Sequence, residues 1–148
     1  MGVIYSVLPV NRESRPWLEE LGIVATGPDS RNPLIGEIYG TLNHLNGISY
    51  QADPVRIGDS WNAQISDNKS PSQDWTRLTI LQCRAPSQPQ DCHFSKGSPR
   101  LIIQVVSALS DRCGALVLSR DGENAFLISP NSDPAELCRN WLDTHQPD

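Results

Sequence analysis

The three consecutive residues Asp91-Cys92-His93 are the part of this 148-residue chain whose side-chain types most suggest chemistry. A cysteine beside a histidine suggests a nucleophile or a metal ligand, because thiolates and imidazoles serve in both roles. Adjacent residues rarely form a working catalytic pair, since the Cys and His of such pairs normally meet from distant positions in the chain. The sequence therefore favours an ordinary loop here. A small enzyme or a ligand-binding protein that uses Cys92 or His93 is the alternative.

The other cysteines and histidines add no support for a metal site. Zinc typically takes four ligands at spacings such as C-x₂-C or H-x₃-H, and neither spacing occurs in the chain. His44 and His145 are isolated from each other and from His93. We therefore predict no catalytic residue, no cofactor and no metal ligand. The four cysteines stand at positions 83, 92, 113 and 138.

The compartment follows from the cysteines and from the first residues. Cys83 and Cys92 flank a proline-rich loop and could pair with each other. The N-terminus lacks a basic region followed by an apolar run, which is the pattern of a signal peptide. Reduced thiols in a cytoplasmic protein are therefore the expectation. No apolar run approaches the ~20 residues needed to cross a bilayer, so no membrane association is expected.

The segment Ser95-Lys96-Gly97-Ser98-Pro99 precedes an expected helix and raises the possibility of phosphate binding. A helix N-terminus offers free N–H groups and the positive end of the helix dipole to an anion. The chain lacks the pattern G-x-x-x-x-G-K-[ST], and Pro99 removes one of the donors. A capped helix start is therefore the favoured interpretation.

The distribution of charge is more informative. The formal net charge is −5, which disfavours a nucleic-acid-binding protein. Six acids and one arginine lie from position 121 to the end, whereas the rest of the chain is close to balanced. An acidic surface of this kind would attract a basic protein partner, and an exposed tryptophan near it would be typical of a binding hot spot. The candidate partner-binding residues are Trp61, Asp121, Glu123, Asp133, Glu136 and Asp143. A packing role is favoured for the tryptophans, and a solvated helix face is favoured for the acids.

A helix followed by a hairpin and a second helix is expected to form the scaffold. Pro99 fits the first position of a helix whose apolar residues recur at helical spacing up to Cys113, and Gly114 is typical of its end. Two short apolar runs at 115–119 and 125–129 then flank an Asp-Gly turn signal. Asp133 and Pro134 indicate the cap and first residue of the last helix. Together these segments predict a C-terminal α–β–β–α block.

The rest of the chain predicts a mixture of short elements. Strands are expected at 3–10, 48–52, 61–65 and 75–83, and a short helix after Ser14. Residues 34–45 fit helical spacing, although Gly36 and Gly40 leave a strand as the alternative. The stretch APSQPQDCHF is expected to be a long irregular loop. The order predicts a single α+β domain over 1–148, with helices packed on a mostly antiparallel sheet.

The stretch FSKGSPRLIIQVVSALSDRCGALVLSRDGENAFLISP, with the small size and the acidic balance, resembles bacterial immunity proteins of the polymorphic-toxin type. The resemblance covers roughly the last third of the chain. It implies a non-enzymatic, cytoplasmic antidote that binds and neutralises one cognate toxin with a basic surface. A subunit or adaptor of a larger assembly remains a further alternative, and the oligomeric state is open.

Overall fold

The computed structural model describes residues 3–70, 74–121 and 124–145, without the side chains of residues 142–145. All strand pairs are antiparallel, and seven strands form one sheet in the order β2-β3-β4-β5-β1-β6-β7. The elements are β1 (Ile4–Pro9), α1 (Arg15–Glu20), α2 (Ile35–His44), β2 (Ile48–Ala52), β3 (Trp61–Asp67), β4 (Trp75–Ile80), β5 (Cys92–Gly97), α3 (Pro99–Cys113), β6 (Leu116–Arg120), β7 (Asn124–Ile128) and α4 (Pro134–His145). The prediction of an α+β fold is confirmed.

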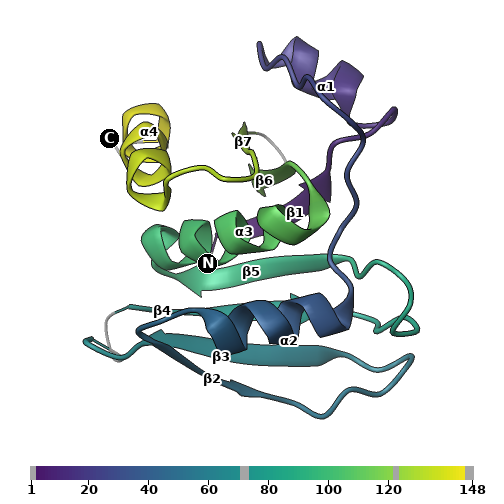
Figure 1. Cartoon of the computed structure of the whole chain (residues 1–148), viewed down its shortest axis with the longest axis vertical. Coiled ribbons are helices and arrows are strands. Elements are labelled where there is room, and N and C mark those ends of the chain that lie inside the picture. Colours follow the sequence, from purple (N-terminus) through teal and green to yellow (C-terminus); the bar gives the residue numbers. More distant parts are fainter. Residues whose placement is uncertain (1–2, 71–73, 122–123, 146–148) are drawn as a thin grey trace.

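The main core lies between the sheet and the helices α2, α3 and α4, and Figure 1 shows α2 and α3 in front of the sheet. The apolar stripe of α3 explains this position, because Leu101, Ile102 and Leu109 are completely buried. α1 covers the opposite face of the sheet over β1, β6 and β7, where Leu18 packs with Val10 and Val117. The remaining part of that opposite face, over β2 to β5, has no helix on it among the described residues.

The expected helix at 99–113 is confirmed at both ends. Pro99 occupies the first turn, and Gly114 ends the helix with a φ of 92°, a conformation that glycine adopts without the steric cost of a Cβ. Asp133 caps α4 by accepting a hydrogen bond from the backbone N–H of Ala135 (3.1 Å). The C-terminal α–β–β–α block is therefore confirmed.

The segment that the sequence left open between helix and strand forms the helix α2. Ile35, Ile38 and Leu42 are buried against the sheet and α3, and this packing outweighs the low helix propensity of the two glycines. Gly40 also has a packing role, since a Cβ there would come within 3.0 Å of the guanidinium of Arg112 on α3.

One expectation about the strands is wrong. The stretch that was expected to be a loop through Cys92 and His93 ends in β5, which lies in the middle of the sheet between β4 and β1. Phe94 pairs with Tyr5 on one side and Leu78 on the other, and it is completely buried. Because β1 is distant in sequence and a long loop separates β4 from β5, the local pattern of polar residues did not reveal this strand.

Within the described residues, no helix combines the length and the apolar character that spanning a bilayer would require.

Candidate functional site

The sheet face opposite α2 and α3 is open over four strands, β2 to β5. Side chains alternate between the two faces of a strand, so the register assigns every second residue of these strands to the open face. The described residues on this face are Ser49, Gln51, Asn62, Gln64, Ser66, Trp75, Arg77, Thr79, His93 and Ser95. Most of them are polar and uncharged, and Arg77 carries the one formal charge of this set. The face is thus polar and nearly neutral.

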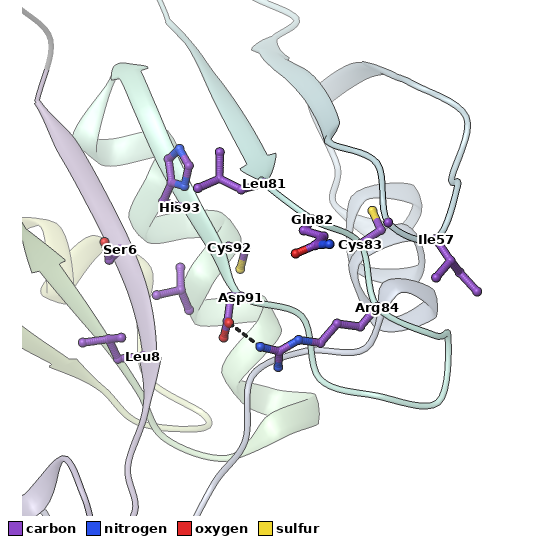
Figure 2. Close-up of a pocket in the computed structure, with 12 residues that line it drawn as sticks. Ser6, Leu8, Ile57, Leu81, Gln82, Cys83, Arg84, Asp91, Cys92 and His93 are labelled. Carbon is purple, nitrogen blue, oxygen red and sulfur yellow. Dashed lines mark hydrogen bonds and ion pairs between the residues drawn. The ribbon is translucent and has the colours of Figure 1, made fainter.

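A cavity of about 560 Å³ lies at the end of this open face, where the chain leaves β4 and enters β5 (Figure 2). Its polar side chains include Ser6 and His93, which are direct partners in the pairing of β1 with β5. Ile57 and Leu81 add apolar surface and are 68% and 73% exposed, respectively. The cavity therefore combines an apolar rim with hydrogen-bonding groups, which is the usual composition of a ligand site.

The loop between β2 and β3 and the loop between β4 and β5 form the wall of the cavity, and backbone hydrogen bonds tie them together. The N–H of Cys83 donates to the carbonyl of Asp59 (2.9 Å), and the N–H of Gly58 donates to the carbonyl of Cys83 (2.8 Å). Gln90 is completely buried, and its amide bonds to both the N–H and the carbonyl of Arg84 (2.9 and 3.0 Å). The cavity is therefore preformed by the protein itself.

The two residues that sequence reasoning singled out differ in what they can do. Burial, with a smaller contribution from Asp91, raises the pKa of Cys92 to about 12. The thiol is therefore protonated at neutral pH and is a poor nucleophile. Burial lowers the pKa of His93, which keeps its ring neutral and able both to donate and to accept a hydrogen bond. The structure thus argues against a Cys92 nucleophile and leaves His93 as a binding group.

Asp91 does not act together with His93. Its carboxylate accepts a hydrogen bond from the guanidinium of Arg84 at 2.7 Å, and Figure 2 shows the ring of His93 pointing away from this ion pair. The charge of Asp91 is thus balanced by Arg84 at the edge of the cavity. Among the described residues, no group of three or more His, Cys, Asp or Glu side chains is placed to hold a metal ion.

The acidic residues expected to bind a partner lie away from this cavity, after β6 and at α4. Asp133 is exposed at the cap of α4, Glu136 is exposed in its first turn, and Asp121 is exposed after β6. Asp121 also has a local role, since its carboxylate accepts a hydrogen bond from the backbone N–H of Ile4 (3.0 Å). Glu123 lies outside the described residues, and Asp143 belongs to α4 but its side chain is not among those described.

The prediction that Trp61 binds a partner is wrong. Its side chain was a candidate for exposed surface, but it is completely buried in β3 beneath α2. Its indole N–H donates to the hydroxyl of Tyr39 (3.1 Å), and the two rings meet edge to face at 5.7 Å. Trp61 is a core residue and cannot contact a partner in this conformation.

No protein-family model, curated protein or solved structure matches this chain. Its function must therefore be argued from its own residues.

Sequence reasoning missed most of the cavity. Ser6, Ile57 and Leu81 come from three separate segments, and no spacing in the sequence links them. The only local signal was the Cys92-His93 pair, which was assigned to a loop. The strand register that places Ser6 opposite His93 is a long-range feature of the sheet.

Proposed function

We propose that the chain is a non-enzymatic protein-binding domain of the immunity type, which neutralises a toxin by covering its basic surface. One observation supports this most directly: all of the net charge of the chain is carried by its last 28 residues, and the described part of this segment supplies β7 and α4 at one end of the sheet. A molecule with its excess charge at one end orients an oppositely charged partner before contact and speeds association.

The described acids of this segment lie near the same end of β1. Asp121, which directly follows β6, is fixed to Ile4, because its backbone N–H donates to the carbonyl of Ile4 (2.8 Å). α4 lies over the next residue of β1, since the rings of Trp141 and Tyr5 meet at 5.6 Å. Asp133 caps that same helix, and Glu136 lies in its first turn. We define Asp121, Asp133 and Glu136 as the acidic end.

The experiment is co-purification of the tagged chain with the product of the neighbouring gene, followed by calorimetric titration of the pair. The charge-removing variant is D133N/E136Q, in which asparagine keeps the helix cap. The matched control is E19Q/E20Q, which removes two exposed charges from α1 at the other side of the molecule.

The expected result is a stoichiometric complex that weakens about tenfold or more in D133N/E136Q at low salt, and much less in E19Q/E20Q. The weakening should shrink as salt is added, because exposed charges are screened over about 8–10 Å at physiological ionic strength. Absence of a complex, or equal weakening by both variants, would contradict the proposal.

Ligand binding in the cavity beside His93 is a second candidate function, and the preformed wall held by Gln90 and Cys83 is the observation that favours it. The cavity suits a small amphipathic molecule that places its apolar part against Ile57 and Leu81 and hydrogen-bonds His93. The test is a thermal-shift screen of amphipathic compounds with the native chain and with H93A. Stabilisation that H93A loses, at an unchanged starting Tm, would support ligand binding; no stabilising compound would count against it.

A further inference from the structure

β2 is an edge strand whose outer side has no partner strand among the described residues. In Figure 1 it forms the lower edge of the sheet. Two flanking hydrogen bonds fix which residues face β3: the N–H of Asp53 donates to Asn62, and the N–H of Asn68 donates to Gly47 (both 2.9 Å). Because the direction of the backbone groups alternates along an antiparallel strand, Ser49 and Gln51 also bond toward β3.

Ile48, Tyr50 and Ala52 alternate with Ser49 and Gln51 along β2. Their backbone N–H and C=O groups therefore point away from β3, to the free edge of the sheet. They supply three donors and three acceptors in a row, which is the arrangement that another antiparallel strand requires.

β2 carries none of the usual features that keep an edge strand from pairing. Natural edge strands are protected by charged side chains, by proline, by a β-bulge or by a covering element. The sequence of β2 is Ile-Ser-Tyr-Gln-Ala, without a charge or a proline, and its register with β3 is regular. The other edge strand, β7, differs because an element packs on it: the ring of Phe126 meets that of Trp141 of α4 at 5.3 Å.

The surroundings of β2 carry few charges. Glu37 of α2, which packs over β2, is paired with Arg31 (2.6 Å), and Asp67 of β3 is paired with Arg100 (2.6 Å). Asp53, which directly follows β2, accepts hydrogen bonds from the backbone and side chain of Asn62. The acidic end lies beside β1 and β6, four to five strand spacings from β2, which is roughly 19–24 Å at about 4.8 Å per strand. This distance exceeds the Debye length of about 8–10 Å, so the negative charges would not oppose contact between two copies at β2.

From these observations we infer that β2 pairs with β2 of a second copy of the chain, antiparallel and around a two-fold axis that passes between the two Tyr50 residues. In this register Tyr50 faces Tyr50 of the second copy, and Ile48 faces Ala52 at both ends. All three pairs are of the hydrogen-bonded kind, so the six outward-facing N–H groups of the two strands meet six carbonyl groups. The edge is self-complementary.

The side chains fit the same register. On the helix side, Tyr50 is already oriented by its hydroxyl, which donates to Asn43 (2.6 Å), and by the ring of Tyr39 at 6.2 Å. On the open face, Ser49 of one copy lies opposite Gln51 of the other, and neither is charged. The contact therefore meets no like-charge repulsion and needs no rearrangement of the strand.

The experiment measures the mass of the purified full chain by light scattering and sedimentation over a range of concentrations. The monomer has a mass of 16.4 kDa, and we expect the mass to rise toward twice that value as concentration increases. A mass that stays at 16.4 kDa up to about 1 mM would overturn the inference, since even a weak dimer would be partly formed there.

A pair of matched variants tests the register. S49K/Q51K places lysine opposite lysine in the proposed dimer and should abolish it. S49E/Q51K places glutamate opposite lysine and should retain or strengthen it. Both variants lose the same hydrogen bond from Ser49 to Asn68, so a folding defect would affect both equally and would show in the circular dichroism spectrum.

The lysine variant also lowers the net negative charge of the chain, which by itself would favour association. Loss of the dimer in S49K/Q51K alone would thus identify the β2 edge. A dimer that survives in both variants, or that both variants lose while folded, would overturn the inference. Because the acidic end is not involved, this test can fail without affecting the proposed function.

Discussion

The carbonyl oxygen of Trp75 lies where a side chain on Gly97 would have to be: a Cβ on Gly97 would come within 1.6 Å of it. Gly97 also has a φ of 96°, in the region that favours glycine. It belongs to the segment Ser95–Pro99 that raised the possibility of phosphate binding. The structure explains why position 97 needs glycine: β5 approaches β4 too closely there for any side chain.

We therefore expect Gly97→Ala to lower the free energy of unfolding by about 3 kcal/mol or more, because either the backbone or β4 must move. The control is Gly58→Ala, which shares a positive φ of 89° but has no atom within 4 Å of the added Cβ. That variant should lose about 1 kcal/mol. Urea denaturation of both variants checks the difference, and equal losses would contradict the steric explanation.

The ion pair between Arg31 and Glu37 should make stability depend on pH. Two hydrogen bonds from Arg31 (2.6 and 3.0 Å), with a smaller one from the backbone of Leu34, lower the pKa of Glu37. A lowered pKa in the folded state means that the stabilisation is complete above the unfolded value of about 4.3, and is lost as the pH falls through the folded value.

Glu37→Gln should accordingly cost about 1 kcal/mol at pH 7, a small value because the side chain of Arg31 is 42% exposed. The difference from the native chain should shrink as the pH falls below about 4. Chemical denaturation at a series of pH values measures it. The control is Asp29→Asn, which breaks the more exposed pair with Arg15 and should change little. A cost of Glu37→Gln that stays constant down to about pH 3 would contradict the assignment.

The cysteines should be unreactive in the folded protein. Burial raises the pKa of both Cys92 and Cys113 to about 12, and Cys83 is only 2% exposed. Cys138 is the single cysteine with intermediate exposure. We expect a thiol reagent at about pH 8 to modify one cysteine at a measurable rate, and all four only in denaturant. Rapid labelling that persists in C138S would show that the buried thiols are accessible.

The buried amide of Gln90 should control the order of the loop between β4 and β5. Gln90→Ala would leave the N–H and the carbonyl of Arg84 without their partner, at a cost of about 1–3 kcal/mol. Gln88→Ala, in the exposed part of the same loop, is the matched control and should be nearly neutral. Hydrogen exchange of residues 81–91 is the measurement: faster exchange in the Gln90 variant alone is expected, and unchanged exchange would contradict this role.

Local sequence was sufficient where an element is defined by its own residues. The apolar stripe of α3, its start at Pro99 and its end at Gly114 lie within 16 consecutive positions, and hydrophobic periodicity with end signals predicted them correctly. The same holds for α4 behind Asp133, and for the charge distribution that underlies the proposed function.

Tertiary structure decided what depends on strands that are distant in sequence. β5 becomes a central strand because Phe94 is buried between Tyr5 and Leu78, although its own segment is polar. The same pairing of β1 with β5 brings Ser6 opposite His93 at the cavity. The packing of α2 on the sheet buries Trp61 against Tyr39. The strand order also leaves β2 at the edge. A single sequence contains every residue of these contacts but not their register, because the free energy of a strand depends mainly on its neighbours.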